Sequence, residues 1–433
     1  MRTSPLISRA AASCMAFVCV AGICQPQEYT RSQRREVQAM LQDVASDVKR
    51  HYYDPQLHGI DWDARVREAK TQIDSSDSLN LAIAHIAAAL ISLDDSHTFF
   101  VPPPRPYIND YGFQMQMVGD RCYVTRVRPG SDAEAKGVKP GDEIVTVNDF
   151  APNRKDFWKM EYVFWTLRPQ PGLSLNLVTL AGNESRVDVM AKFRQLPAVN
   201  GIFDFELQMN DQEGSLLLRY AERGDDLLIV RISGFLLLPP DLDTLVGKMR
   251  KHSAVILDLR GNPGGSVETL QAVLGGMFDK KVKIADRVSR GKTKAVEIKP
   301  EHHGYTGKLV VLIDSGSASA SEIFARVVQL EKRGLVVGDR SAGMVMEAEY
   351  YGHEIGTNPF ILYGVSVTSA DLIMADGHSL EHRGVVPDVV VLPAATDLAN
   401  GRDPALAKAA ELLNVEISPE EAGKLFPYEW PKD

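Results

Sequence analysis

Four apolar segments in the second half of this 433-residue chain constrain its fold most strongly. They read LLIVRI (227–232), AVILDL (254–259), LVVLI (309–313) and GLVVG (334–338). Stretches with helical spacing, such as Val267–Met277 and Glu322–Lys332, lie between them. Short, continuously apolar strands that alternate with helices are typical of a parallel sheet with helices on both faces. We therefore predict an α/β core over residues 200–398.

The residues before this core divide into two regions with different periodicity. Residues 31–100 show apolar side chains at helical spacing and predict a small helical domain. The positions concerned are Val37, Met40, Leu41, Val44 and Val48, then Leu79, Ile83, Ile86 and Leu90. A proline cluster at 101–106 ends this pattern. The segment 107–195 then predicts a β-rich domain, with strands at Tyr123–Val127, Glu143–Val147, Ser174–Leu180 and Arg186–Met190. Residues 399–433 are expected to form a helical tail.

The first two dozen residues have the composition of an export signal. Arg2 and Arg9 flank a short polar start, and Ala10–Cys24 carries no charge. Such a stretch suits a secretory signal and is short for a membrane span, while a buried helix is the less favoured alternative. We predict a signal peptide over residues 1–24 and a periplasmic or secreted protein. The mature chain would have no integral membrane span and would retain only Cys122 of the four cysteines.

The overall composition excludes two functional classes. Lys and Arg number 48 against 57 Asp and Glu, so the formal net charge is −9, and no long basic run occurs. A surface that follows nucleic-acid phosphates needs clustered positive charge, so no nucleic acid is expected as a ligand. Charged residues make up 24% of the chain and hydrophobic residues 44%, which is typical of globular domains and not of multi-span membrane proteins.

A glycine-rich turn follows the second apolar segment. AVILDL leads directly into Arg260–Gly265 (RGNPGG), and a helix is expected to begin near Ser266. A turn of this kind at the carboxyl end of a strand leaves backbone N–H groups free to face an anion. The chain lacks the Gly-Lys-Ser/Thr and G-x-G-x-x-G patterns here, so a nucleotide site is disfavoured, and a plain tight turn remains the simpler alternative.

A serine-rich turn follows the third apolar segment. Asp314–Glu322 reads DSGSASASE and precedes the buried face of a helix. A serine at a strand-to-helix turn exposes its hydroxyl at the sheet edge, where the helix N-terminus favours developing negative charge. Ser319 with Glu322 three positions later also fits a capping box. From these residues alone, a nucleophile and a helix cap are equally supported.

Taken together, LDLRGNPGG and GSASASEIFA resemble the tail-specific (C-terminal processing) and tricorn-core family of serine peptidases. The likeness extends from the N-terminal helices to the closing LEHRGVVPD, and it implies a core of the ClpP/crotonase-like type. In that family the middle serine of the SASAS run is the nucleophile, which is Ser319 here. The resemblance also implies an oxyanion hole formed by the backbone N–H groups of Gly265 and Ala320, since acyl transfer needs two fixed donors.

The residue at the position of the general base differs from that of the processing peptidases. Those enzymes carry a lysine beyond the nucleophile helix, but the matching position here is Met344, whose thioether cannot accept the proton. The tricorn-like branch uses a histidine, and His97 in LDDSHT resembles its Ser-His pair. A glutamate orients this pair in that branch, so Ser96 and Glu381 complete the implied set.

Several alternatives at this site stay open. His97 by itself is as readily a hydrogen-bonded structural histidine, and Glu347 or Glu349 are alternatives to Glu381. A nearby carboxylate would raise the pKa of His97 above its usual value. His378 and His382 stand four apart but lack the H-E-x-x-H pattern, so no metal and no cofactor are expected.

The β-rich segment also resembles a known module. Tyr111–Met115 (YGFQM) and Arg128–Glu143 are similar to a bacterial PDZ domain, which adds a peptide strand to its own sheet edge. The resemblance implies that Gly112 and Phe113 lie at the peptide-binding loop. A helix with Trp158, Tyr162 and Trp165 would form the opposite groove wall or belong to the core.

The implied protein is a multi-domain α/β serine endopeptidase that is exported. It would cleave unfolded or C-terminally presented polypeptides by a Ser/His/Glu acyl-enzyme mechanism. The alternative is a non-catalytic protein that binds peptides or apolar ligands on the same fold. Retention of both Ser319 and His97 favours the enzyme.

Overall fold

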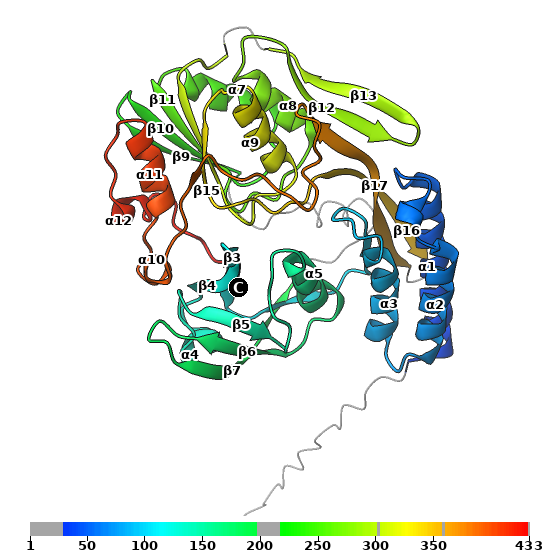
Figure 1. The fold of residues 1–433 in the computed structure, drawn as a ribbon. Helices are drawn as coiled ribbons and strands as arrows, with labels where there is room; N and C mark the ends of the chain where they lie inside the picture. The colour runs from blue at the N-terminus through cyan, green and yellow to red at the C-terminus, as the bar shows by residue number, and fades with distance from the viewer. Residues whose placement is uncertain (1–28, 197–216, 301–303, 357–359, 432–433) are drawn as a thin grey trace, which may run out of the picture.

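The computed structural model describes residues 29–196, 217–300, 304–356 and 360–431 (Figure 1). The predicted export signal lies outside these residues. The described chain forms an N-terminal helical region, a β-rich module and an α/β core, which confirms the predicted fold class (Figure 1). No helix among the described residues combines the length and apolar character that crossing a membrane requires.

Three helices form the N-terminal region: α1 (Arg31–His51), α2 (Trp62–Ser75) and α3 (Leu79–Ile91), with a 3-10 turn η1 (Leu57–Gly59). Helix α1 begins at Thr30, whose hydroxyl accepts a hydrogen bond from the N–H of Gln33 at 3.2 Å. The apolar positions predicted from helical spacing form the buried face of α1 and α3, except that Leu79 is only partly buried. This face packs on Tyr363, Val365 and Val367 of a much later strand, so the helices share their core with that strand.

The β-rich module is one antiparallel sheet in the order β3-β4-β5-β6-β7. Its strands are β3 (Phe113–Val118), β4 (Arg121–Val127), β5 (Glu143–Val147), β6 (Gly172–Val178) and β7 (Glu184–Met190). Short helices α4 (Asp132–Ala135) and α5 (Phe157–Glu161) accompany it, and a π-helical segment η2 (Tyr162–Leu167) continues α5. A separate pair, β2 (Tyr107–Asp110) and β8 (Lys192–Gln195), connects the module to the rest. Strand β3 is an edge strand.

The α/β core is a six-stranded sheet in the order β18-β15-β14-β11-β10-β9. Its strands are β9 (Leu218–Arg223), β10 (Leu227–Ile232), β11 (Ala254–Asp258), β14 (Lys308–Ile313), β15 (Leu335–Gly338) and β18 (Val389–Val390). The four central strands are parallel. Thus all four apolar segments predicted as strands are adjacent strands of one sheet.

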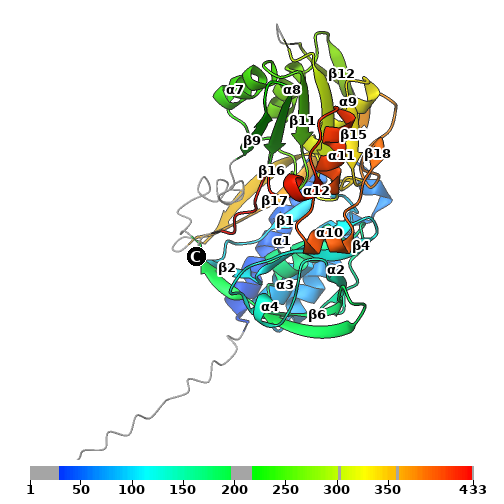
Figure 2. The ribbon, with the colours of Figure 1, turned by 90° about the vertical axis from the view of Figure 1, so that its left-hand side faces the viewer.

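Helices cover both faces of this sheet (Figures 1 and 2). Helices α7 (Pro239–Met249), α8 (Val267–Gly275) and α9 (Ala320–Leu330) pack on one face. Helices α11 (Pro404–Leu412) and α12 (Pro419–Ala422) cover the other face, and α10 (Ala395–Ala399) precedes them. Because β10 is buried on both faces, its side chains alternate between the two cores, with Leu228 and Val230 in one and Leu227 and Ile229 in the other.

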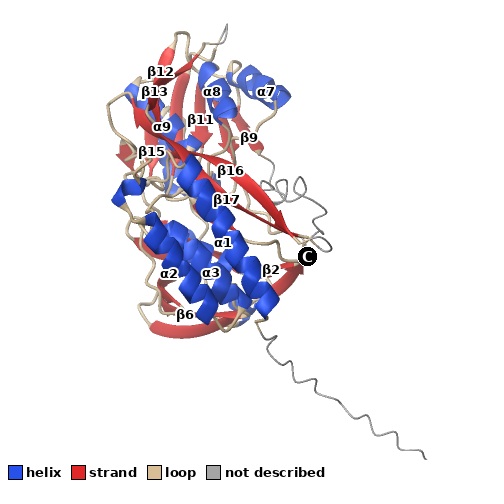
Figure 3. Cartoon of the chain, turned by 90° about the vertical axis from the view of Figure 1, so that its right-hand side faces the viewer, coloured by secondary structure: helices blue, strands red, loops and turns tan. Residues whose placement is uncertain are grey.

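A second sheet joins the core to the N-terminal helices. It contains β1 (Phe99–Val101), β12 (Val282–Ser289), β13 (Lys292–Ile298), β16 (Met346–Ile355) and β17 (Ile361–Met374). The long strand β17 pairs with β1, β12 and β16, and the hairpin β16–β17 extends along α1 (Figure 3). No local pattern in the sequence predicts this sheet. This sheet brings the segments that contain His97 and Glu381 to the core.

Candidate active site

Ser319 lies at the turn between β14 and α9, where it is the N-cap residue of the helix. Its backbone has φ 54° and ψ −118°, which is uncommon for a residue with a side chain. Its hydroxyl makes no capping hydrogen bond, because the N–H of Glu322 donates to the carbonyl oxygen of Ser319 at 2.9 Å. Helix capping therefore does not account for this hydroxyl.

Glu322 is a fully buried carboxylate beneath this turn. One oxygen accepts the N–H groups of Ser319 and Met344, both at 3.0 Å. The other accepts the Ser341 hydroxyl at 2.6 Å and the N–H of Gly343 at 2.7 Å. Burial raises the pKa of Glu322 to about 7, although these four donors favour the ionised form. Glu322 thus ties the serine turn to the segment 341–344.

The glycine-rich turn after β11 is held against the serine turn by Asn262, which is fully buried. Its Nδ2 donates to the carbonyl oxygen of Ile232 at 2.9 Å, and its Oδ1 accepts the N–H of Gly264 at 2.8 Å. Its own carbonyl oxygen accepts the N–H of Ala318 at 3.0 Å and the Ser321 hydroxyl at 2.9 Å. One side chain and its peptide group therefore fix the distance between the two motifs.

The two glycines at the end of this turn have close neighbours. A Cβ at Gly264 would lie 2.7 Å from the Cβ of Ser319. At Gly265, where φ is +145°, a Cβ would lie 2.3 Å from the carbonyl oxygen of Phe235. A side chain at either position would push the turn away from the serine, so both positions need glycine.

Gly265 and Ala320 were implied to donate to an oxyanion. In the described part of the chain, neither backbone N–H donates to another protein group. Ala320 is the first residue of α9, where the partial positive charge of the helix N-terminus favours an anion. The two N–H groups are therefore available as oxyanion donors.

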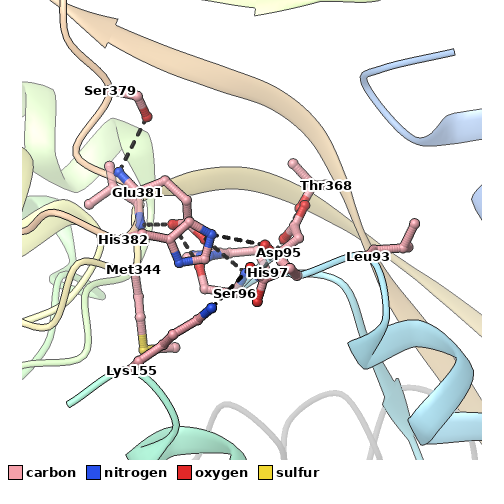
Figure 4. A network of polar contacts seen from close by, with 12 residues as sticks. Leu93, Asp95, Ser96, His97, Lys155, Met344, Thr368, Ser379, Glu381 and His382 are labelled. Carbon is pink, nitrogen blue, oxygen red and sulfur yellow. Dashed lines mark hydrogen bonds and ion pairs between the residues drawn. The ribbon is translucent and has the colours of Figure 1, made fainter. Parts of the chain in front are cut away.

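Figure 4 shows the polar contacts around His97. Glu381 Oε1 accepts the N–H of Ser96 at 2.9 Å, and Glu381 Oε2 accepts its hydroxyl at 2.9 Å. The Ser96 Oγ lies 2.8 Å from His97 Nδ1. Since the Ser96 hydroxyl gives its one proton to Glu381, its oxygen accepts from Nδ1–H, which leaves Nε2 of His97 as the proton acceptor.

The pairing of β1 with β17 positions His97. Phe99, two residues after the histidine, pairs with Ser366, so the short segment 95–98 lies at the sheet edge. Asp95 Oδ1 accepts the N–H of His97 at 2.7 Å and the N–H of Thr98 at 3.0 Å. It also accepts the Thr368 hydroxyl of β17 at 2.7 Å. Asp95 therefore fixes the backbone that carries the imidazole.

Glu381 approaches Ser96 from the turn that follows β17. Its N–H donates to the Ser379 hydroxyl at 3.2 Å, and its carboxylate also accepts the N–H of Val345 at 2.7 Å. The two alternative carboxylates lie elsewhere. Glu347 accepts from Nε of Arg287 at 2.8 Å, and Glu349 accepts the Tyr351 hydroxyl at 2.8 Å. Of the three glutamates, it is Glu381 that contacts Ser96.

The electrostatics of His97 differ from the expectation. Burial lowers the pKa of His97, and the negative charge of Asp95 opposes this effect without overcoming it. The expected rise above the usual value is therefore wrong, because loss of hydration outweighs the nearby carboxylate. Burial also raises the pKa of Glu381, against the hydrogen bonds from the N–H groups of Val345 and Ser96. A lowered histidine pKa keeps the imidazole neutral at neutral pH, as a general base requires.

His382 and Met344, the residue at the position of the lysine in the processing peptidases, make contacts other than those of a metal ligand or a general base. His382 Nε2 lies 2.9 Å from the carbonyl oxygen of Asp94. No cluster of three or more His, Cys, Asp or Glu side chains within the described ranges is arranged to hold a metal ion. Met344 presents its backbone to the site, since its carbonyl oxygen accepts the N–H of Ser319 at 2.9 Å.

One cavity of about 1010 Å³ borders both His97 and the serine turn. Ser96, His97, Ala318 and Met344 line one side of it. Among the described residues no hydrogen bond joins the Ser319 hydroxyl to His97, but the residue before the serine and the imidazole face the same space. Edge strand β3 and helix α5 line the other side, so the groove of the β-rich module opens toward His97 and the serine turn.

The loop that was predicted to bind peptide uses part of its hydrogen-bonding capacity internally. Phe113 is buried and lines the cavity. Gly112 has φ +71°, and its N–H donates to Oδ1 of Asp110 at 2.8 Å, so this donor is used within the loop. Asp110 in turn pairs with Arg128 at 2.8 Å.

The aromatic residues of the predicted groove helix were expected to form either a groove wall or part of the core, and both cases occur. Trp158 and Trp165 line the cavity. The Tyr162 hydroxyl instead donates to the carbonyl oxygen of Phe100, and its ring packs against the helical core.

Three residues hold the site together in ways that the sequence does not reveal. They are Asp95, Asn262 and Glu322, and for Glu322 the unpredicted feature is its burial beneath the serine turn. All three are polar residues next to or inside the motifs that carry the chemistry. Their signal is a short polar side chain in a segment that is otherwise buried, a pattern that requires hydrogen-bond partners. The partners lie far away in the sequence and cannot be named from it.

Comparison with known protein families identifies three regions. Residues 226–391 match peptidase family S41, residues 108–161 match the PDZ domain, and residues 33–75 match the tricorn protease C1 domain. These matches cover most of the α/β core, much of the β-rich module and nearly all of helices α1 and α2. They confirm the resemblance drawn from the two motifs and from the PDZ-like segment.

Two curated relatives match most of the chain. A tail-specific protease of Haemophilus influenzae is 24% identical over 373 residues, which are 83% of this chain and 48% of the relative. Carboxyl-terminal-processing peptidase 3 of Arabidopsis thaliana is 24% identical over 372 residues, 82% of this chain and 68% of the relative. The chain thus spans about half the length of the first of these relatives.

Two solved structures share the fold. Mature CPAF superposes with a TM-score of 0.62 at 16% identity and covers 85% of this chain and 94% of its own. The photosystem II D1 C-terminal processing protease superposes with a TM-score of 0.52 at 19% identity, covering 89% of this chain and 99% of its own. Both span the helical region, the β-rich module and the core.

Proposed function

We propose that the protein is a serine endopeptidase, because its core, residues 226–391, matches the model of peptidase family S41. One observation carries the proposal. A continuous chain of hydrogen bonds links Glu381 to Ser96 and Ser96 to His97 Nδ1, across 285 residues of sequence, at the cavity that the serine turn borders. A binding protein has no need of an imidazole held in this tautomer.

The proposed reaction begins with attack by the Ser319 hydroxyl oxygen on the scissile carbonyl carbon. His97 Nε2 accepts the hydroxyl proton, and the imidazolium is stabilised through Ser96 by the Glu381 carboxylate. The tetrahedral oxyanion receives hydrogen bonds from the N–H groups of Gly265 and Ala320. Catalytic hydrogen bonds commonly tighten only when substrate binds, which is consistent with the open Ser319–His97 contact.

The second half of the cycle returns the enzyme to its starting state. His97 gives its proton to the leaving amine, and the C–N bond breaks to leave an ester on Ser319. A water molecule then attacks this ester while Nε2 again accepts a proton. The carboxylic acid product leaves as the serine hydroxyl is restored. Each proton thus passes through Nε2, which is why the orientation of Nδ1 toward Ser96 matters.

The proposed substrates are unfolded or C-terminally presented polypeptides. The supporting feature is the cavity, because edge strand β3 borders the same space as His97. An extended chain that adds to β3 as a further strand would continue toward Ser319. Gly112 and Phe113 would contact the peptide near the start of β3. We further propose that the protein is exported, on the composition of residues 1–24.

A fluorophosphonate probe tests the catalytic proposal, since it reacts covalently only with an activated serine. The full chain is expected to be labelled at Ser319, as located by peptide mass spectrometry. Ser319→Ala should abolish labelling, and His97→Ala should slow it by at least about 100-fold, because the general base is lost. Lactacystin is a second probe, since mature CPAF forms a complex with it.

Met344→Ala is the matched control, because Met344 lines the same cavity without a proposed chemical role. It should label at a rate within a few-fold of the parent. A folded chain that remains unlabelled would support the non-catalytic alternative, and equal losses in His97→Ala and Met344→Ala would refute His97 as the base. Circular dichroism of each variant verifies that the fold is intact.

A further inference from the structure

A segment of this chain lies across the substrate cavity. After α12, residues 426–431 leave the core and run to β3 and β4 of the β-rich module (Figures 1 and 2). The start of the segment is attached to the core, since Arg219 Nη1 donates to the carbonyl oxygen of Pro427 at 2.9 Å. Its other end is attached to the module, where Arg128 Nη2 donates to the carbonyl oxygen of Pro431 at 3.2 Å.

Two aromatic rings of the segment stack on two arginines of the module. The guanidinium of Arg126 lies 4.7 Å from the ring centre of Tyr428, and that of Arg128 lies 5.0 Å from the ring of Trp430. The two arginines are two positions apart in the sequence, and so are the two aromatic residues. An extended segment therefore presents both rings to the same side of β4. Gln114 of β3 adds a hydrogen bond from its Nε2 to the Tyr428 hydroxyl. This match in spacing defines a two-ring subsite.

The subsite belongs to the catalytic cavity. Tyr428, Trp430 and Pro431 line the cavity that contains Ser96 and His97. Tyr428 and Trp430 also line a neighbouring cavity of about 650 Å³, which reaches Arg260 and Asp314 beside the two catalytic turns. The two rings therefore form part of the wall between two spaces. Removal of both rings would join these spaces along β3.

The way the segment is held suits an exchangeable ligand. Tyr428 is 39% exposed. Within the described residues the segment does not pair with edge strand β3, so the backbone groups of that edge stay available. Side-chain stacking of arginine on an aromatic ring is a modest attraction at a partly exposed site. A substrate with suitably spaced aromatic side chains would offer the same contacts together with strand pairing.

We propose that Arg126, Arg128 and Gln114 form a subsite for extended polypeptides with two aromatic side chains at positions i and i+2, and that Tyr428 and Trp430 occupy it as a competing internal ligand. The substrate-selecting role rests on the proposed peptidase function. The binding role does not, because it concerns only the affinity of the subsite for a peptide.

A binding experiment tests the subsite independently of catalysis. The probe is a fluorescein-labelled peptide with the sequence of residues 425–431, LFPYEWP, and the protein is the full chain with Ser319→Ala. Fluorescence anisotropy should show at least about tenfold tighter binding once Tyr428→Ala and Trp430→Ala empty the subsite. The peptide LFPAEAP should bind the emptied chain weakly. Adding Arg128→Lys, which keeps the charge but removes the planar stacking group, should weaken LFPYEWP binding about threefold to tenfold.

Arg121→Lys, at the opposite and exposed end of β4, is the matched control and should leave binding unchanged. Equal binding of LFPYEWP and LFPAEAP to the emptied chain would overturn the proposal. So would equal binding of LFPYEWP to the occupied and emptied chains. With Ser319 intact, the emptied chain should show a lower KM for an unstructured substrate at unchanged kcat. If the protein cleaves nothing while the anisotropy result holds, the peptidase function fails and the subsite stands.

Discussion

At the scale of single residues, the site depends on buried polar groups that hold unusual conformations. Ser319 has a positive φ, which costs free energy for a residue with a Cβ, and Glu322 compensates by accepting its N–H. Asp95 plays the corresponding part for His97 by accepting its N–H. Both carboxylates act on the backbone of a reacting residue, so they are positioning residues for the proposed chemistry.

The pH dependence of kcat/KM should report the lowered pKa of His97. Activity should rise with pH as His97 loses its proton, with the midpoint below the usual histidine value of 6.5, because burial disfavours the imidazolium. Asp95→Asn removes the charge that raises this pKa, so its acid limb should move to still lower pH. The measurement is a pH–rate profile on one unstructured fluorogenic peptide.

Asp94→Asn is the control for this prediction, since it removes the same charge one residue away. Asp94 pairs with Lys159 at 3.2 Å and is not a neighbour that shifts the pKa of His97. Its acid limb should match that of the parent. An unshifted limb in Asp95→Asn, with the fold intact, would show that another group controls the ionisation of the base.

At the scale of elements, two turns at the carboxyl ends of neighbouring parallel strands meet and bring together the two proposed oxyanion donors. Strands β11 and β14 are paired, so the turns that follow them are adjacent at one sheet edge. Asn262 links the turns, and Gly264 allows one backbone to approach Ser319 closely. The parallel sheet thus supplies the geometry, and the small residues make the close approach possible.

Gly265→Ala tests this arrangement. The new Cβ would lie 2.3 Å from the carbonyl oxygen of Phe235, so the turn must shift and move its N–H away from the oxyanion. The loss of one oxyanion donor is expected to lower kcat by about 100-fold to 1000-fold, with a smaller effect on KM. Steady-state kinetics on the fluorogenic peptide measure both constants.

Gly224→Ala separates this effect from general backbone strain. Gly224 also has a positive φ, +58°, but a Cβ there has open space. The variant should lose about 1 kcal/mol of stability and keep its kcat. If Gly265→Ala kept the same kcat as Gly224→Ala, the N–H of Gly265 would not be an oxyanion donor.

At the scale of the whole molecule, the β-rich module is attached to the core beside the serine turn. Arg154 Nη1 donates to the carbonyl oxygen of Arg340 at 2.8 Å, and Arg154 also pairs with Asp339. Gln116 of β3 donates to Oδ2 of Asp314 at 2.6 Å. These contacts hold edge strand β3 beside the serine turn, so the proposed substrate binding and the proposed chemistry depend on the same contacts.

Arg154→Ala should therefore affect long substrates more than short ones. Loss of its contacts to the core would let β3 move away, and we expect KM for an unfolded protein to rise about tenfold, the effect of roughly 1.4 kcal/mol. A short fluorogenic ester, which reaches the serine turn alone, should be hydrolysed almost normally. Arg121→Ala, which removes an exposed arginine of the same module, should change neither. Equal losses on both substrates would indicate damage to the catalytic turns themselves.

The sequence by itself determined the parts of this protein that depend on local patterns. Continuous apolar runs predicted the four central strands, because strands buried on both faces must be apolar throughout. Alternation predicted β4 to β7, and the helical spacing predicted α1 and α3. The two motifs located the serine-rich and glycine-rich turns, and their resemblance to a peptidase family selected Ser319 as the predicted nucleophile.

Only the tertiary structure decided how distant residues meet. The strand β17 contains polar and apolar residues without a clear period, because one part covers the helices and another part pairs within the core. Its pairing with β1 brings Ser96 to Glu381, which no local pattern specifies. The lowered pKa of His97 likewise arises from burial by segments far apart in the sequence. Contacts of this kind depend on how distant segments pack against one another. A local sequence pattern does not specify how close two such segments lie.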